Sequence, residues 1–211
     1  MEAKEKIVES ATELFTRYGI RSVTMDDVAK EASMSKKTLY QYFQNKDSLV
    51  TEVVQKHFEL ERAEFEGIKA QADNAIHELI LTAQCIRKHV YKTNPSLLLD
   101  MQKFHGLAWR EYLDFKHSTI KGQIEDNIRR GIKEGYFRSE MDPEILAIFR
   151  VESVQLIFDP KVFPNDKFDF PTIQIQIMDH FINGLLTDEG RKKYEEYSEN
   201  EIADSLTTNL R

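Results

Sequence analysis

The chain has 211 residues, of which 41% are hydrophobic, and its 29 basic and 36 acidic side chains give a net charge of −7. This length can bury one good core and leaves room for a second. No apolar run reaches the roughly 20 residues that span a membrane, and the start of the chain holds no apolar secretion core. The single cysteine excludes an internal disulfide. We therefore expect a soluble cytoplasmic protein with no membrane partner.

The acidic charge lies outside the first quarter of the chain. Residues 1–50 hold eight Lys or Arg and eight Asp or Glu, so the remainder carries the whole charge of −7. A negatively charged remainder reduces non-specific affinity for nucleic acid, but the local field around a basic surface near the amino end matters more than the total. The net charge therefore does not exclude DNA binding.

The amino-terminal part of the chain predicts three short helices. Thr24, followed three residues later by Asp27, is typical of a capping box at the start of the second helix. Ser35 is placed to cap the third helix, after a break at Ser33. The third helix has too small an apolar stripe to be stable alone, so it must pack on its neighbours, and the first helix supplies apolar positions at helical spacing. These positions are Ile7, Ala11, Leu14, Phe15 and Tyr18.

The third helix has two different faces. Leu39 and Phe43 are four residues apart and share a stripe that should be buried, whereas Lys37 and Gln41 share the opposite stripe. A helix with a polar, basic outer face that is held from behind by a small core suits the major groove of DNA. The segment from residue 23 to residue 46 therefore predicts a helix-turn-helix DNA reader.

The same segment strongly resembles the DNA-binding domain of the tetracycline-repressor (TetR) family. In that family a Thr begins the second helix, an Ala lies within it, a Ser caps the third, and Thr-Leu-Tyr-x-Tyr-Phe-x-x-Lys follows. The matching residues are Thr24, Ala29, Ser35, Thr38-Leu39-Tyr40, Tyr42-Phe43 and Lys46. The resemblance covers residues 4 to about 54. One position departs, since the turn usually carries Gly where this chain has Ser33; if the backbone there has a positive φ, Ser is unfavourable by about 1 kcal/mol or less.

The resemblance implies roles for individual residues. Thr24, Tyr42 and Lys46 match positions that contact backbone phosphates, which fix the register without reading sequence. Lysine suits guanine and glutamine suits adenine, so the outer face can read either base. Taken singly, each lysine could equally be an ordinary solvated residue, and Tyr40 a core residue. The residues that match base-facing positions are Lys36, Lys37, Thr38, Tyr40 and Gln41.

The rest of the chain also has helical periodicity, so we expect an all-α protein of two domains. The helix-turn-helix domain takes residues 1–46, and a helical effector-binding and dimerisation domain takes residues 47–211. Asn45 is placed to cap a long helix that runs from residue 46 to about residue 70 and connects the two.

Further helices follow from caps and periodicity. A helix fits residues 73–93, Asn94-Pro95 opens a short helix through Phe104, and a long helix around residues 107–134 ends at Gly135. Asp142-Pro143 begins a helix of about 16 residues. A loop with three prolines spans residues 159–171, and the charged tail from residue 187 predicts one short helix and a frayed end.

Two of the helices indicate how the chain assembles. Residues 145–158 are apolar nearly all round, and so are residues 172–186, in which a strand-like alternation from Ile173 is outweighed by four-residue spacing that continues to Leu185. A helix that is apolar on more than one face is normally covered on more than one face. With the family resemblance, this favours a homodimer through helices 143–158 and 172–186, packed around a twofold axis. Helices buried within a monomer are the alternative.

The resemblance also implies a small-molecule effector held among the helices of residues 73–158, and no cofactor. Aromatic side chains with a few polar groups suit a mostly apolar ligand. Ordinary helix packing is the alternative explanation for each of them. The candidate lining residues are His89, Phe104, His105, Trp109, Tyr112, Phe149 and Gln155.

Motifs for catalysis are missing from the sequence. It has no phosphate-binding glycine motif, no Gly-x-Ser-x-Gly elbow and no His-Glu-x-x-His zinc site, and its six histidines never pair at four-residue spacing. We therefore expect neither an enzyme nor a metal site. Cys85 lies in an apolar helical context, which favours an inert core thiol over a redox sensor.

Two functional hypotheses remain. The first is a homodimeric, ligand-responsive transcriptional regulator, acting as a repressor, that binds a palindromic operator in double-stranded DNA through its helix-turn-helix. The second is a helical small-molecule or protein-binding module in which the helix-turn-helix is vestigial. The intact polar and basic outer face of the third helix argues against the second hypothesis.

Overall fold

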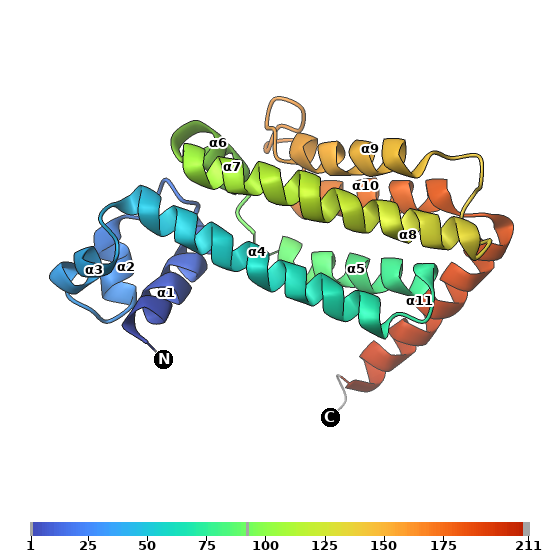
Figure 1. The fold of residues 1–211 in the computed structure, drawn as a ribbon, viewed down its shortest axis with the longest axis horizontal. Coiled ribbons are helices and arrows are strands. Elements are labelled where there is room, and N and C mark those ends of the chain that lie inside the picture. The colour runs from blue at the N-terminus through green and yellow to red at the C-terminus, as the bar shows by residue number, and fades with distance from the viewer. Residues whose placement is uncertain (1, 92, 209–211) are drawn as a thin grey trace.

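The computed structural model describes the backbone of residues 2–91 and 93–208, and the side chains as far as residue 198 (Figure 1). These residues form α1 (Ala3–Tyr18), α2 (Met25–Glu31), α3 (Lys36–Tyr42), α4 (Lys46–Gln71), α5 (Ala75–Val90), α6 (Leu97–Phe104), α7 (Gly106–Phe115), a π-helical turn (Lys116–Ile120), α8 (Lys121–Lys133), α9 (Pro143–Ile157), α10 (Phe170–Leu185) and α11 (Asp188–Thr208). The described part of the chain contains no strand, only an isolated bridge between Phe137 and Leu186. Among the described helices, none combines the length and apolar character needed to cross a bilayer. The all-α prediction is confirmed.

The predicted helix-turn-helix is present, with the predicted caps. Thr24 Oγ1, Ser35 Oγ and Asn45 Oδ1 each accept a hydrogen bond from the amide three residues later, at 3.2, 3.1 and 2.9 Å. These bonds satisfy donors that a helix start leaves unpaired, so α2, α3 and α4 each begin where the sequence indicates. Leu39 and Phe43 are 0% and 3% exposed, as expected for the inner stripe of α3.

The turn between α2 and α3 contains an unfavourable backbone conformation. Ser33 has φ = 55°, the one positive φ at a non-glycine position in the described residues. The turn is closed by the Met34 amide, which donates to the Ala29 carbonyl at 2.8 Å. The family's usual Gly would therefore be less strained here than Ser, as the sequence comparison suggested.

Helix α4 connects the three-helix unit to the remaining helices (Figure 1). It packs on α1 near its start and on α5 and α7 further along. One hydrophobic core runs from the three-helix unit, through Leu49 and Val53 of α4, to Leu98, Met101 and Tyr112 of α6 and α7. The core is therefore continuous across the domain boundary that was predicted at residue 46.

A second core lies among α5, α8, α10 and the start of α11. It contains Ile76, Ile80, Ile128 and Ile182, all at most 5% exposed. Beyond α8 the chain reverses at Gly135, whose φ of 79° is the left-handed conformation that commonly follows the last turn of a helix. The predicted end of this helix is confirmed, and the predicted helix of residues 107–134 is present as α7 and α8 joined by the π turn.

The helix predicted to open at Asn94-Pro95 begins later, at Leu97, and that expectation was wrong by about two residues. Asn94 Oδ1 accepts from the Ser96 amide at 2.9 Å, which forms a local turn before the helix. The Asn94 amide also donates to the Thr16 carbonyl of α1 at 2.9 Å. The segment is thus held as a connection to α1 and cannot supply the first helical turn.

The tail forms a longer helix than the short one predicted, because α11 spans Asp188–Thr208. Its start is tied to the bundle where the Thr187 amide donates to the Tyr136 carbonyl at 2.9 Å. Further along, Tyr197 stacks on His77 of α5 with ring centroids 4.7 Å apart. These contacts join residues more than 50 positions apart, so periodicity could not reveal them. The predicted frayed end beyond residue 208 lies outside the described residues.

Candidate DNA-binding surface and effector region

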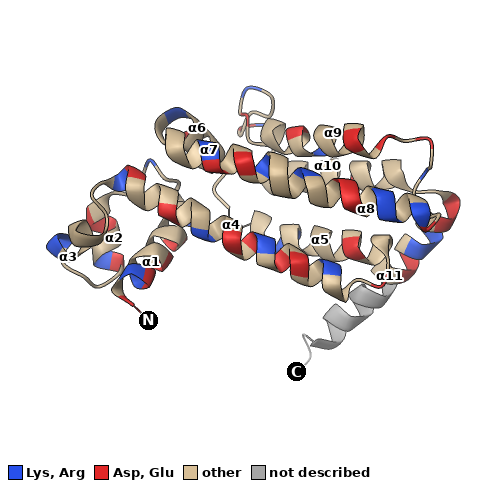
Figure 2. Ribbon diagram, in the orientation of Figure 1, with Lys and Arg blue, Asp and Glu red and all other residues tan. Residues whose placement is uncertain are grey.

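The outer face of α3 gathers the residues predicted to face base edges. Lys36, Lys37 and Gln41 are exposed, Tyr40 is 43% exposed, and Thr38 is half-buried beside Ser35. Figure 2 shows the basic residues of α3 on the side of the three-helix unit that faces away from the other helices. The sequence folds in this way because Leu39 and Phe43 hold the opposite stripe of α3 in the core. The result is an accessible, polar and basic helix surface.

The two lysines of this surface differ in their surroundings. Lys36 Nζ lies 2.8 Å from Asp26 Oδ1, and both side chains are 62% exposed. Its hydrogen bond to Asp26 raises the pKa of Lys36 above its ordinary value. Within the part of the chain that the structure describes, Lys37 forms no ion pair, so its charge is available to a ligand without first breaking a contact.

The residues matched to phosphate contacts also stabilise the three-helix unit. Lys46 Nζ donates to the Ile20 carbonyl at 2.6 Å, and partial burial lowers the pKa of Lys46 although Asp100 opposes this. Thr24 Oγ1 donates to Asp27 Oδ2 at 2.6 Å. Tyr42, by contrast, is 46% exposed on the surface. Any phosphate contact by Lys46 therefore uses an ammonium that already has one partner.

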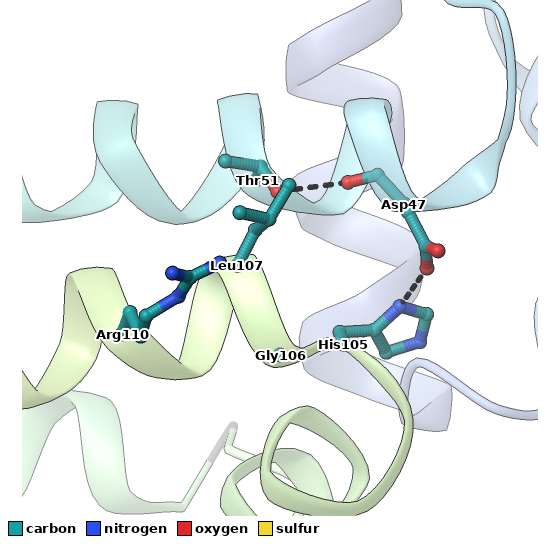
Figure 3. Close-up of a pocket in the computed structure, with 6 residues that line it drawn as sticks. All are labelled: Asp47, Thr51, His105, Gly106, Leu107 and Arg110. Carbon is teal, nitrogen blue, oxygen red and sulfur yellow. Dashed lines mark hydrogen bonds and ion pairs between the residues drawn. The ribbon is translucent and has the colours of Figure 1, made fainter.

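A cleft of about 440 Å³ lies where the three-helix unit meets the other helices. Figure 3 shows Asp47 and Thr51 of α4 facing His105 and the start of α7. The imidazole of His105 is 9% exposed, and its Nδ1 lies 2.5 Å from Asp47 Oδ1. Leu107 and Arg110 complete the lining. Most of the side chains that line the cleft are polar, and the contact between His105 and Asp47 joins α4 to the start of α7.

A second hollow, of about 250 Å³, contains two of the predicted effector-lining residues, Trp109 and Gln155. Tyr112 is buried behind Trp109, with ring centroids 5.1 Å apart. One wall is fixed by Lys116 of the π turn, which donates to Gln155 Oε1 at 3.0 Å and to Glu152 at 2.7 Å. The full lining is Leu98, Leu99, Gln102, Trp109, Glu152, Gln155, Leu156, Phe158 and Asp159.

The other effector candidates lie elsewhere. His105 belongs to the cleft between α4 and α7, and His89, Phe104 and Phe149 are exposed residues that line neither hollow. The structure thus brings together Trp109, Tyr112 and Gln155 of the predicted set. Helical spacing alone could not separate these residues, because which face of α5, α6 or α9 points inward depends on the packing of the bundle.

Sequence reasoning missed two buried cations in this region. Lys116 is 2% exposed, and Arg150 of α9 is 4% exposed. Arg150 donates to Ser153 Oγ at 3.2 Å and lies over the Phe181 ring, and burial lowers its pKa to about 10. Gln174 Oε1 is also buried, and it has no hydrogen-bond partner among the described residues. For Arg150 the signal was available, since it is the one charged residue between Ile145 and Val151.

An exposed apolar stripe runs along α9. Ile145, Ile148, Phe149 and Leu156 are 64, 45, 57 and 51% exposed, and they recur at the spacing of one helix face. In α10 the apolar residues instead face the bundle of their own chain: Ile173, Met178, Phe181, Ile182 and Leu185 are buried. The two helices that the sequence shows as similarly apolar are therefore used differently.

A capped helix-turn-helix that carries a basic outer helix, followed by an all-helical bundle, defines a class of helix-turn-helix transcriptional regulators. The profile of the family described as "Bacterial regulatory proteins, tetR family" matches residues 7–53. The chain is 32% identical, over 160 residues, to the HTH-type transcriptional regulator SAB2452 of Staphylococcus aureus (strain bovine RF122 / ET3-1). The aligned region covers 72% of this chain and 84% of that regulator. The chain belongs to the TetR family of transcriptional regulators.

Two further similarities agree with this. The HTH-type transcriptional repressor KstR2 of Mycobacterium tuberculosis (strain CDC 1551 / Oshkosh) is 23% identical over 153 residues, 68% of this chain and 74% of the relative. A transcriptional regulator from Saccharomonospora viridis, solved in complex with choline, has the same fold, with a TM-score of 0.72, 18% identity, and coverage of 88% of this chain and 98% of that one. Each of these proteins is named as a transcriptional regulator, not as an enzyme.

Proposed function

We propose that this chain is a homodimeric, ligand-responsive transcriptional repressor that binds a palindromic operator through α3. The observation that carries the proposal is the exposed outer face of α3, with Lys37 and Gln41 accessible over the buried Leu39 and Phe43. Lys36, Thr38 and Tyr40 flank that face. Base edges in the major groove would be read by this face, while Thr24, Tyr42 and Lys46 would contact phosphates. The repressor relative named above supports the direction of the regulation.

The exposed stripe of α9 supports a dimer. Four large apolar side chains along one helix, from Ile145 to Leu156, form a surface that water would otherwise cover at a cost in free energy. A second copy offers the same stripe around a twofold axis, with the outer face of α10 beside it. Two α3 helices would then enter successive major grooves, with half-sites roughly 34–36 Å apart or somewhat more.

The hollow that contains Trp109 and Gln155 is the proposed effector site. Its indole and phenyl groups suit an apolar ligand body, and Gln102, Glu152 and Asp159 offer acceptors to donor groups on the ligand. Leu98, at its edge, belongs to the core that α4 shares with the three-helix unit. A ligand that favours another arrangement of α6 and α7 would change the spacing of the two α3 helices, and a hundredfold loss of operator affinity requires about 2.7 kcal/mol of differential binding.

The main alternative is a binding module that does not read DNA. An experiment that separates the two incubates the purified full chain with random fragments of its source genome at several salt concentrations and sequences what remains bound. A repressor selects a palindromic sequence and loses affinity steeply as salt rises, because lysines at phosphates release counterions. Recovery of no preferred sequence at any salt concentration would reject the proposal, and the genes beside recovered sites would suggest effectors to test.

A further inference from the structure

Three metal-binding side chains come together between α4 and α5. Glu64 comes from α4, and Cys85 and His89 come from α5, where their spacing of four residues places them on one face of the helix. One ligand atom from each lies within 4.8 Å of the other two. His89 Nε2 and Glu64 Oε2 are 3.8 Å apart. The expectation of no metal site came from the absence of histidine pairs at four-residue spacing, and Cys85 and His89 have this spacing although only one of them is a histidine.

The chemistry of these groups suits a divalent ion of the zinc type. Thiolate, imidazole and carboxylate are the three kinds of ligand that zinc takes in proteins. With bonds of about 2.0 to 2.3 Å, the ligand atoms of a tetrahedral site lie about 3.3 to 3.8 Å apart. The ligand atoms of the observed group lie within 4.8 Å of one another, so the group is wider than such a site by at most about 1.0 to 1.5 Å. Glu64 and His89 are exposed, whereas Cys85 is buried.

The surroundings favour a cation. A second acidic residue, Glu61, lies one turn before Glu64 on α4. His57 Nε2 lies 3.6 Å from Glu61 Oε2, so a further imidazole is near. Glu61 and Glu64 thus lie close together on α4, and a bound cation would relieve the repulsion between them.

We propose that Glu64, Cys85 and His89 bind one divalent transition-metal ion of the zinc type, with water in the remaining position. On binding, the S–H bond of Cys85 is replaced by a sulfur–metal bond and the proton passes to solvent. The exposed sides of Glu64 and His89 provide the route of entry. The site joins α4, which continues into the three-helix unit, to α5 of the second core.

The test uses the full chain, stripped of metal with a chelator, and Co²⁺ as the probe. The expected result is one Co²⁺ bound per chain, with a near-ultraviolet thiolate-to-cobalt absorption band that Zn²⁺ abolishes. Cys85→Ser and Cys85→Ala should each remove the band. His89→Ala and Glu64→Gln should each weaken binding roughly tenfold or more, since even changes outside the ligand sphere have effects of that order.

His117→Ala is the matched control, because His117 is an exposed histidine of the π turn away from this group, and it should bind Co²⁺ as the unaltered chain does. Circular dichroism establishes that each variant is folded. Binding does not depend on DNA, so the result is independent of the proposed repressor function. Absence of the band in the folded, unaltered chain would overturn the proposal. So would a band that survives Cys85→Ala, or unchanged affinity in both His89→Ala and Glu64→Gln.

Discussion

At the scale of single residues, neighbouring side chains decide which of the chemically similar groups can act. Lys36 and Lys37 are adjacent in sequence, yet Asp26 pairs with one of them and not with the other. Since a surface ion pair contributes little and is weakened by salt, Lys36 can still exchange Asp26 for a phosphate. Lys37 needs no such exchange, and it lies on the stripe opposite the core.

The first residue-scale prediction concerns Lys37. Lys37→Ala should weaken operator binding by about 1–3 kcal/mol and relax the preference at particular base pairs, because a lost base contact affects only the sequence it reads. Binding is measured by fluorescence anisotropy on the selected operator and on single-base variants. Lys133→Ala, at an exposed lysine of α8, serves as the control and should leave affinity unchanged. An equal loss on every sequence would place Lys37 at the phosphates.

A second residue-scale prediction follows from the positive φ of Ser33. Ser33→Gly should raise the free energy of unfolding, because glycine adopts this conformation without strain. The gain should be no more than about 1 kcal/mol, because glycine also has more conformational freedom in the unfolded chain. Urea denaturation followed by circular dichroism measures the change. Ser33→Ala should stabilise nothing, and a gain equal to that of glycine would show that the backbone conformation is not the cause.

The third residue-scale prediction concerns the buried charge of Arg150. Its guanidinium lies among Ser153, Met178 and Phe181, and no ion pair with a carboxylate is present among the described residues. Arg150→Met keeps an unbranched, flexible side chain at this position and removes the desolvated charge, so we expect a stability gain of about 1–3 kcal/mol. Thermal and urea unfolding would measure it. A loss of similar size would mean that the guanidinium has a partner that offsets its burial.

At the scale of elements, α9 and α10 show that apolar composition does not determine what covers a helix. Both helices are rich in apolar residues. In α10 the apolar groups meet the second core, whereas α9 keeps Ile145, Phe149 and Leu156 on the surface. The difference arises because α9 lies at the edge of the bundle, against α8 on one side and α10 on the other.

The prediction at this scale is that the α9 stripe holds the dimer together. Phe149→Lys should convert a species of about twice 24.7 kDa into monomers, because it places a charge in an apolar contact. Light scattering after gel filtration measures the mass. Leu60→Lys changes a similarly exposed apolar residue on α4, 61% exposed, and should leave the dimer intact. A dimer that persists in Phe149→Lys combined with Leu156→Lys would contradict the proposed interface.

At the scale of the whole molecule, the three-helix unit and α4, α6 and α7 share one core. Additional ties cross the same junction: the Arg21 amide donates to Asp100 at 3.1 Å, and His105 pairs with Asp47. A structural change at the hollow beside Trp109 can therefore be transmitted to α3 through side chains that are in continuous contact. The three-helix unit is consequently not an independent appendage of the bundle.

This predicts that the two predicted domains unfold together. Leu98→Ala removes a buried side chain from the shared core, and should lower the free energy of unfolding by about 2–5 kcal/mol. Unfolding can be followed by Trp109 fluorescence, which reports on α7, and by loss of operator binding, which reports on α3. The unfolding midpoints measured by these two probes should fall by the same amount. Exposed Leu107→Ala is the control. Two separate midpoints would show that the core does not couple the parts.

Local sequence was sufficient to place the helix-turn-helix and most helix ends. The caps at Thr24, Ser35 and Asn45, and the glycine after α8, act through hydrogen bonds and backbone angles within a few residues, so their effect can be recognised without knowing the fold. The stripe of Leu39 and Phe43 fixed the outer face of α3 for the same reason.

Only the tertiary structure decided the features that depend on distant partners. These features depend on contacts between segments that lie far apart in the chain. They are the length of α11, the exposure of the α9 stripe, the lining of the hollow by Trp109 and Gln155, and the proximity of Glu64 to Cys85 and His89. Periodicity states that a helix has an apolar face, but the partner of that face is set by how whole helices pack, which no short window of sequence contains.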